Sequence, residues 1–342
     1  SSGKIFTGVI KRMDSVLLPA KIPQFTTYQC DACPAIVMAG NPTADNWYFN
    51  NGLQIKCNKF FDTESNGDFE LSFVKSGYSQ MKDVLEYHTL CRKIFVPFAS
   101  SIIHYCLSHW YYVYIDCYDE FYLENARLFQ KRHCIHDCLI YGYDCSSDKY
   151  NIAVYTETDH FGFITSSRKS LEQALESEYI TRDSVMDNLG HLCAMRVRSD
   201  EIVFDRICAK RGIQDYLCRF SEINCGDKSS VAVGAETGKY LLKYLSFVEE
   251  NKYSPDMRIS LFYVEHKRLL FKFIKKVESV CDCGSGFSCG YEEVIENSEK
   301  IHLLFLKINM TDNYSPIEKI KTLVERNITA EGEILSKLSE VM

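Results

Sequence analysis

A cysteine at the start of a predicted helix is the first feature of this sequence that could do chemistry. Cys30 opens the run Cys-Asp-Ala-Cys-Pro-Ala-Ile-Val, and residues 31–40 are predicted to form a helix with Pro34 in its first turn, where a missing N–H costs nothing. The N-terminal end of a helix dipole favours a thiolate, the nucleophilic form of cysteine. Gln24 lies six residues upstream. We therefore expect Cys30 to be a nucleophile, with Cys33, one helical turn further on, as the alternative.

A histidine that enters a predicted strand could supply the general base. His136 directly precedes an uninterrupted strand pattern within residues 134–143, which is predicted to form a hairpin with residues 149–156 across a short polar loop. A histidine in this place can accept the proton of a cysteine thiol. His133 lies three residues earlier, so strand alternation would put it on the opposite face. We expect His136 to be the base.

These residues resemble the active-site motifs of papain-like cysteine peptidases, in particular the bacteriocin-processing peptidases that remove double-glycine leaders. The likeness to the cysteine motif rests on Gln24, Cys30 and the run Ala-Cys-Pro-Ala-Ile at 32–36. The likeness to the histidine motif rests on the strand 136–143. That strand is still more similar to the butirosin biosynthesis protein H family, whose N-terminal domain is a papain-like acyltransferase. The chain looks most like the cysteine-protease-like amide synthases of polythioamide assembly within this group.

The resemblance implies amide formation rather than proteolysis. An acyl group would arrive as a thioester on the phosphopantetheine arm of an acyl or peptidyl carrier protein, pass to Cys30 and leave to a primary amine or diamine. Gln24 would direct its amide N–H to the oxyanion, His136 would act as base, and no further cofactor is implied. A cysteine peptidase or hydrolase of the same fold, and a non-catalytic interaction protein with a decayed triad, are the alternatives.

One position departs from the pattern of the family. Its members often carry an acidic residue about eighteen positions after the histidine, where it orients the imidazole, and this chain has Val154 there. The orienting role could pass to Asn151, Thr156 or Asp159, of which we favour Asp159. A Cys–His pair can also work alone, since a thiol needs less activation than a hydroxyl.

The elements that must position these residues fall into two parts. A helix at 81–92 and strands at 110–116, 134–143, 149–156 and 161–165 are predicted in the first part. Ser170 followed by Gln173 forms a capping-box pattern, after which helical periodicity covers 200–220, 236–252, 256–279, 291–307 and 317–341. The sequence therefore predicts an α+β, papain-like catalytic domain over residues 1–166 and a helical domain over residues 167–342.

Composition narrows the function classes. With 39 Lys and Arg against 46 Asp and Glu, the net charge is −7, which argues against nucleic-acid partners. The most apolar stretch, 94–115, contains Pro97, His104 and His109 and is too polar to span a membrane. No signal peptide is recognised and most of the sixteen cysteines lie among apolar residues, so we expect a cytoplasmic protein with reduced thiols.

Two further motifs give weaker evidence about function. Cys281, Cys283 and Cys289 lack a fourth zinc ligand nearby, and the glycines between them lack the third glycine of a dinucleotide fingerprint, so neither a metal nor a nucleotide cofactor is expected. A basic stripe at 267–276 could steer an acidic carrier protein, but the solvated face of an amphipathic helix explains it at least as well.

Overall fold

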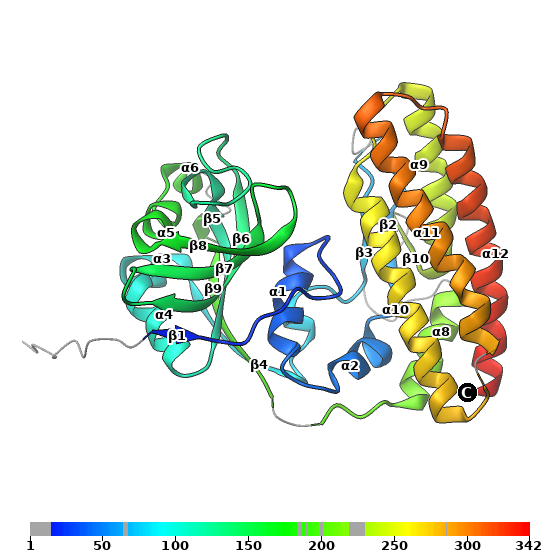
Figure 1. Cartoon of the computed structure of the whole chain (residues 1–342), viewed down its shortest axis with the longest axis horizontal. Helices are drawn as coiled ribbons and strands as arrows, with labels where there is room; N and C mark the ends of the chain where they lie inside the picture. The colour runs from blue at the N-terminus through cyan, green and yellow to red at the C-terminus, as the bar shows by residue number, and fades with distance from the viewer. Residues whose placement is uncertain are drawn as a thin grey trace, which may run out of the picture. The chain divides into compact units, whose positions relative to one another are not determined.

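The computed structural model describes residues 15–63, 68–182, 187–188, 190–198, 201–218, 230–284 and 286–342. The chain divides into two compact units (Figure 1). Unit 1 comprises residues 1–40 and 81–199, and unit 2 comprises residues 41–80 and 200–342. The protein is an α+β protein with a helical C-terminal region.

Unit 1 is built on one antiparallel sheet of seven strands. The strand order is β4-β9-β5-β6-β7-β8, and the short β1 pairs with the end of β6. Long β-branched and aromatic runs form the central strands, which are buried on both faces. The strands are β1 (Val16–Leu17), β4 (Leu85–Cys91), β5 (Tyr112–Asp119), β6 (Ile135–Asp144), β7 (Lys149–Tyr155), β8 (Phe161–Ser167) and β9 (His191–Val197).

Helices cover both faces of this sheet. Helix α1 (Gln29–Met38) packs on β6 and β9, on the face that carries Tyr114 and Cys193. Helix α4 (Ala99–Ser108) packs on β5 and β6 from the other face, where Val113 and Ile140 pair. Among the described residues, this unit also contains the shorter helices α3 (Arg92–Phe95), α5 (Arg168–Leu175) and α6 (Glu178–Thr181).

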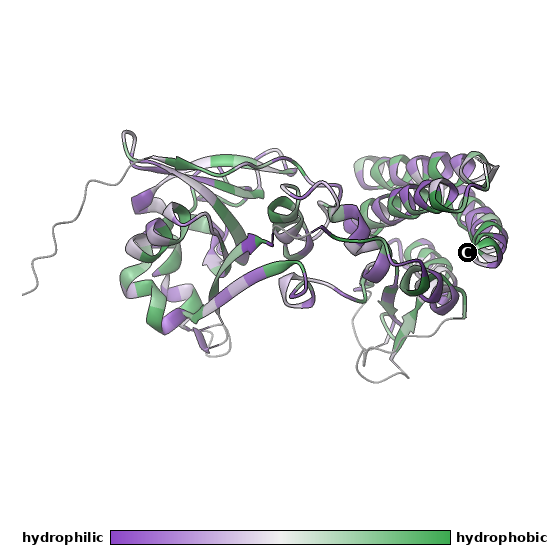
Figure 2. Cartoon of the chain, turned by 90° about the horizontal axis from the view of Figure 1, so that it is seen from below, coloured by the Kyte–Doolittle hydropathy of each residue, from purple (hydrophilic) through white to green (hydrophobic). Residues whose placement is uncertain are grey.

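Unit 2 combines a small sheet with long helices. Three antiparallel strands, β2 (Ile55–Asn58), β3 (Leu71–Phe73) and β10 (Val231–Val233), pair in the order β10-β2-β3. Hydrophobic and hydrophilic residues alternate along the helices, as Figure 2 shows, and the apolar positions are buried between them. The helices are α2 (Ala44–Asn51), α8 (Arg206–Cys218), α9 (Thr237–Asn251), α10 (Met257–Cys281), α11 (Gly286–Thr311) and α12 (Ile317–Val341).

Several predicted elements are confirmed and others differ. The hairpin of β6 and β7 and the four C-terminal helices lie where the sequence placed them. The predicted helix at 81–92 is instead strand β4, which pairs with β9 along its whole length. Helix α5 begins at Arg168 because Ser167, not Ser170, caps it: the Ser167 Oγ accepts a hydrogen bond from the backbone N–H of Ser170 at 3.2 Å.

The domain boundary also differs from the predicted one at 166. Strand β9 lies between β4 and β5, so the sheet of unit 1 extends to Val197. Residues 41–80 belong to unit 2, because β2 pairs with β10 from the C-terminal half of the chain. Within the described part of the chain, no helix is both long and apolar enough to cross a lipid bilayer.

Candidate active site

Cys30 lies in the first turn of α1. The helix begins at Gln29, two residues earlier than predicted, after Tyr28 in extended conformation with φ −123°. Pro34 is therefore the sixth helical residue, where it cannot donate the usual helical hydrogen bond to the carbonyl of Cys30. The Cys30 side chain is half-buried, so a substrate from solvent can meet it at the positive end of the helix.

His136 lies at the start of β6, with 26% of its side chain exposed. Its ring Nδ1 is 2.8 Å from Oδ1 of Asp137 and 2.9 Å from Nε2 of Gln29. Gln29 directly precedes Cys30, so its side chain joins the beginning of the cysteine helix to the histidine strand. This contact brings the backbone of the candidate nucleophile next to the candidate base.

Asp137 supplies the carboxylate that contacts both His136 and Gln29. The hydroxyl of Tyr114 donates a hydrogen bond to its Oδ2 at 2.7 Å, while Gln29 Nε2 donates to its Oδ1 at 3.1 Å and to its backbone carbonyl. Hydrogen bonds to both oxygens therefore hold the Asp137 carboxylate in one orientation.

The Gln29 amide and the backbone of Asp137 both reach Nδ1 of the imidazole. Gln29 Oε1 accepts a hydrogen bond from the backbone N–H of Tyr155 at 2.9 Å, so the NH₂ group must face His136 and Asp137. The backbone N–H of Asp137 donates to His136 Nδ1 at 3.0 Å, and the carboxylate of the same residue lies 2.8 Å from that nitrogen. Together these contacts hold the imidazole ring in one orientation.

Burial and Asp137 act in opposite directions on the pKa of His136. Burial lowers the pKa of His136, but the hydrogen bond to Asp137 and the charge of that carboxylate raise it, and the resulting pKa lies above the ordinary value of 6.5. Burial, followed by the charge of Asp137, raises the pKa of the Tyr114 hydroxyl well above 10. Tyr114 therefore remains a neutral donor at physiological pH.

The two cysteines of α1 differ in access. Cys33 is fully buried, and burial raises the pKa of its thiol well above 9.0, with the charge of Asp137 adding to the effect. A thiol in this state is a poor nucleophile. Cys30 is half-buried, and its charge contributes to the raised pKa of Tyr114, which places it near the Tyr114–Asp137 contact. Of these two thiols, Cys30 is the one suited to attack.

The predicted orienting residue lies elsewhere. Asp159 occupies the turn between β7 and β8 at φ 59°, with 75% of its side chain exposed and its carboxylate 3.5 Å from Nη1 of Arg127. The hydroxyl of Thr156, the second alternative, is 2.8 Å from that of Thr158, and Asn151 lies in β7 opposite Gly142. The structure thus replaces Asp159 by Asp137 as the carboxylate beside His136.

The other predicted residues are placed as follows. Gln24 is half-buried in the segment that precedes α1. His133, the alternative base, has its Nδ1 2.7 Å from Oδ2 of the fully buried Asp119, and its ring stacks on Phe121 with centroids 4.3 Å apart. This places His133 in a structural cluster at the end of β5.

Sequence reasoning missed Gln29, Asp137 and Tyr114. Two of them have a weak signal, since Gln29 adjoins the cysteine and Asp137 adjoins the histidine. Strand alternation argues against Asp137, because neighbouring residues of a strand point to opposite faces. The contact forms at the very beginning of β6, next to a shift in the register of the β5–β6 pair between Ile115 and Tyr118.

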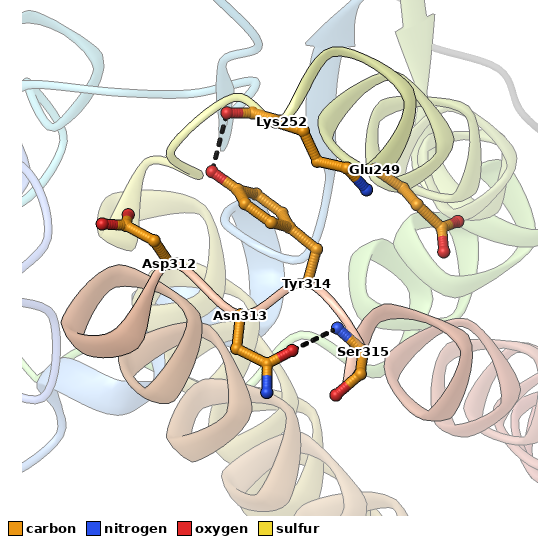
Figure 3. A pocket seen from close by; sticks show the side chains of 6 residues that line it. All are labelled: Glu249, Lys252, Asp312, Asn313, Tyr314 and Ser315. Atoms are coloured by element: carbon orange, nitrogen blue, oxygen red, sulfur yellow. Dashed lines mark hydrogen bonds between the residues drawn. The ribbon is translucent and has the colours of Figure 1, made fainter.

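Unit 2 contains no comparable arrangement among the residues described. The basic stripe on α10 is broken, because Lys267 is buried and lies 2.9 Å from Glu331, whereas the exposed Arg268 and Lys272 pair with acidic side chains. A surface pocket of about 810 Å³ lies where α9 ends and α12 begins, and in it the Tyr314 hydroxyl donates to the carbonyl of Lys252 (Figure 3). In the described residues, no three His, Cys, Asp or Glu side chains gather as metal ligands.

No protein-family model and no curated protein sequence matches the chain.

Proposed function

We propose that unit 1 is a papain-like cysteine acyltransferase that forms amides. The observation that carries the proposal is the Gln29 side chain, which links the helix start that bears Cys30 to His136 and Asp137. A half-buried thiol at the start of a helix, which the adjacent Gln29 links to an imidazole held by a carboxylate, supports nucleophilic acyl transfer.

The proposed first half-reaction consumes a thioester on an acyl or peptidyl carrier protein. His136 Nε2 takes the proton of Cys30, and Sγ attacks the thioester carbonyl. The carbonyl oxygen gains negative charge, which the Gln24 amide and the backbone N–H of Cys30 stabilise. The carbon–sulfur bond to the carrier then breaks, and His136 returns the proton to the departing thiolate.

In the second half-reaction a primary amine or diamine attacks the acyl-enzyme. The amine loses a proton to His136, the bond to Cys30 breaks, and the thiolate is reprotonated, so that one amide and the regenerated enzyme result. No cofactor takes part in either step. A cytoplasmic setting fits this chemistry, since carrier-bound thioesters are made there, and no disulfide links two of the fifteen described cysteines.

Intact-protein mass spectrometry with a panel of acyl thioesters tests the proposal. The wild-type chain should gain the mass of one acyl group and lose it on addition of a diamine, with an amide as product. Cys30→Ala should gain no mass, whereas the matched Cys33→Ala variant should still be acylated.

Two other results would redirect the assignment. Release of the free acid at the same rate with and without amine would indicate a hydrolase of the same fold. The absence of any acyl adduct, together with a Cys30 that alkylates no faster than the other exposed thiols, would indicate a non-catalytic protein.

A further inference from the structure

A groove of about 690 Å³ lies on the face of the unit 1 sheet opposite to α1. It exists because α4 covers β5 and β6 but leaves the edge strand β4 and its neighbour β9 open beside it, and because the small Ala194 lies at its floor. Its volume is that of a typical small-molecule site. Asp137 and Tyr114 lie on the other face of the sheet, so this groove is separate from the Cys30 site.

The body of the groove is apolar. Leu192 pairs with Leu90 and Ala194 pairs with His88 across the β4–β9 ladder, so these four side chains share the face that forms the floor. Ile102 and Tyr105 of α4 form a wall, although Tyr105 is 65% exposed.

The polar residues that line the groove favour an anion. Among the described residues of its lining, Arg196 is the permanent cation and none is acidic, in a chain of net charge −7. The carboxylate of Glu86, next to the lining, lies 3.3 Å from His88 Nε2 and accepts a hydrogen bond from the Tyr111 hydroxyl at 2.5 Å. Arg196 uses Nε and Nη2 to bind Glu86 outside the lining, at 2.9 and 2.8 Å, and its guanidinium lies over the Tyr111 ring at 4.6 Å. Its Nη1 has no partner among the described atoms and can donate to a ligand.

The backbone next to the groove holds a tryptophan in the left-handed region. Trp110 follows the C-cap residue of α4, His109, and lies in the left-handed region at φ 65°, a position where glycine is the usual residue; its side chain is 67% exposed. It lies between His109 and Tyr111, which both line the groove. Neither helix capping nor core packing accounts for a tryptophan here, whereas an aromatic surface at the rim of a ligand site does.

We propose that this groove binds a small carboxylate with an aromatic or aliphatic body, which lays the body on Leu192 and Ala194 and the carboxylate against Nη1 of Arg196. The proposal is independent of acyl transfer at Cys30.

Two fluorescent probes of similar shape test it in the full-length chain. Anilinonaphthalenesulfonate is an apolar-bodied anion, and N-phenylnaphthylamine is its uncharged counterpart. We expect saturable binding of the anion at one site, displacement by decanoate, and a change in the emission of the exposed Trp110, because the other tryptophan, Trp47, is buried in unit 2.

Two substitutions separate the contribution of the Arg196 charge from that of the volume of the groove. Arg196→Gln should weaken binding of the anionic probe about tenfold and leave the uncharged probe unchanged. Ala194→Phe should fill the floor and weaken both probes. Arg258→Gln, an exposed arginine paired with Asp256 in unit 2, is the matched control and should alter neither, and Cys30→Ala should also leave both affinities intact.

Anion binding that neither Arg196→Gln nor Ala194→Phe weakens would overturn the assignment, as would the absence of saturable binding in the wild-type chain. Should Ala194→Phe fail to fold, the contrast between the two probes in Arg196→Gln decides the question on its own.

Discussion

At the scale of single residues, Asp137 is the side chain on which the candidate base depends. Its carboxylate contacts His136 Nδ1 and raises the pKa of that imidazole. We expect Asp137→Asn to lower kcat for amide formation about 100-fold, because the imidazole loses the carboxylate that orients it and raises its pKa. The acid limb of the kcat/KM profile should move to lower pH. Asp159→Asn is the matched control, and an equal loss in that variant would restore Asp159 to the orienting role.

The raised pKa of His136 also makes stability depend on pH. Since its pKa in the folded chain exceeds the ordinary value of 6.5, the imidazolium stabilises the fold fully below that value. This contribution disappears as the pH rises through the pKa of the folded state. Urea unfolding of wild type and His136→Gln should therefore show a larger difference at pH 5.5 than at pH 8.5. A difference that grows with pH would contradict the ion pair with Asp137.

What the sequence could predict at this scale was residue type and spacing, not side-chain direction. Cys30 and His136 stand on separate elements that the fold places side by side, which motif spacing anticipated. The carboxylate next to His136 was missed because alternation along a regular strand argues against it. Only the local geometry at the beginning of β6 shows that two neighbouring residues face each other.

At the scale of elements, the buried ion pair between α10 and α12 is important for the stability of unit 2. Lys267 and Glu331 are almost fully buried, and the Tyr216 hydroxyl donates to the same carboxylate at 2.6 Å. Removing one partner leaves a buried charge, so Lys267→Ala should lower the free energy of unfolding by about 3–5 kcal/mol in urea titrations. Lys272→Ala, five residues along the same helix in a half-exposed pair, should change it by less than about 0.5 kcal/mol. Equal losses in the two variants would contradict the distinction.

Elements with local signals were predictable, and those that depend on distant partners were not. The long amphipathic helices can be recognised from apolar residues that repeat every 3.6 positions, and Asp256 is the N-cap of α10. Residues 81–92 also carry apolar side chains at helical spacing, but pairing with β9, a hundred residues away, makes most of them a strand. Tertiary pairing overrides local propensity in this segment.

At the scale of the whole molecule, the two units are interleaved along the chain rather than consecutive. Because β9 lies between β4 and β5, a fragment of residues 1–166 would lack an interior strand of its own sheet. It would also carry residues 41–80 without β10, the strand that pairs with β2. We expect this fragment to show no cooperative unfolding transition by circular dichroism and no preferential alkylation of Cys30.

A rearranged chain provides the matched comparison for this last expectation. Residues 1–40 joined by a flexible linker to residues 81–199 contain every strand of the seven-stranded sheet, together with α1 and the start of β6. Such a chain should unfold cooperatively and keep a Cys30 that alkylates ahead of the buried Cys33, since Gln29, His136 and Asp137 all remain in it. Cooperative folding of the 1–166 fragment with a reactive Cys30 would instead support the boundary at 166, and β9 would then be an addition to the catalytic unit rather than a part of it.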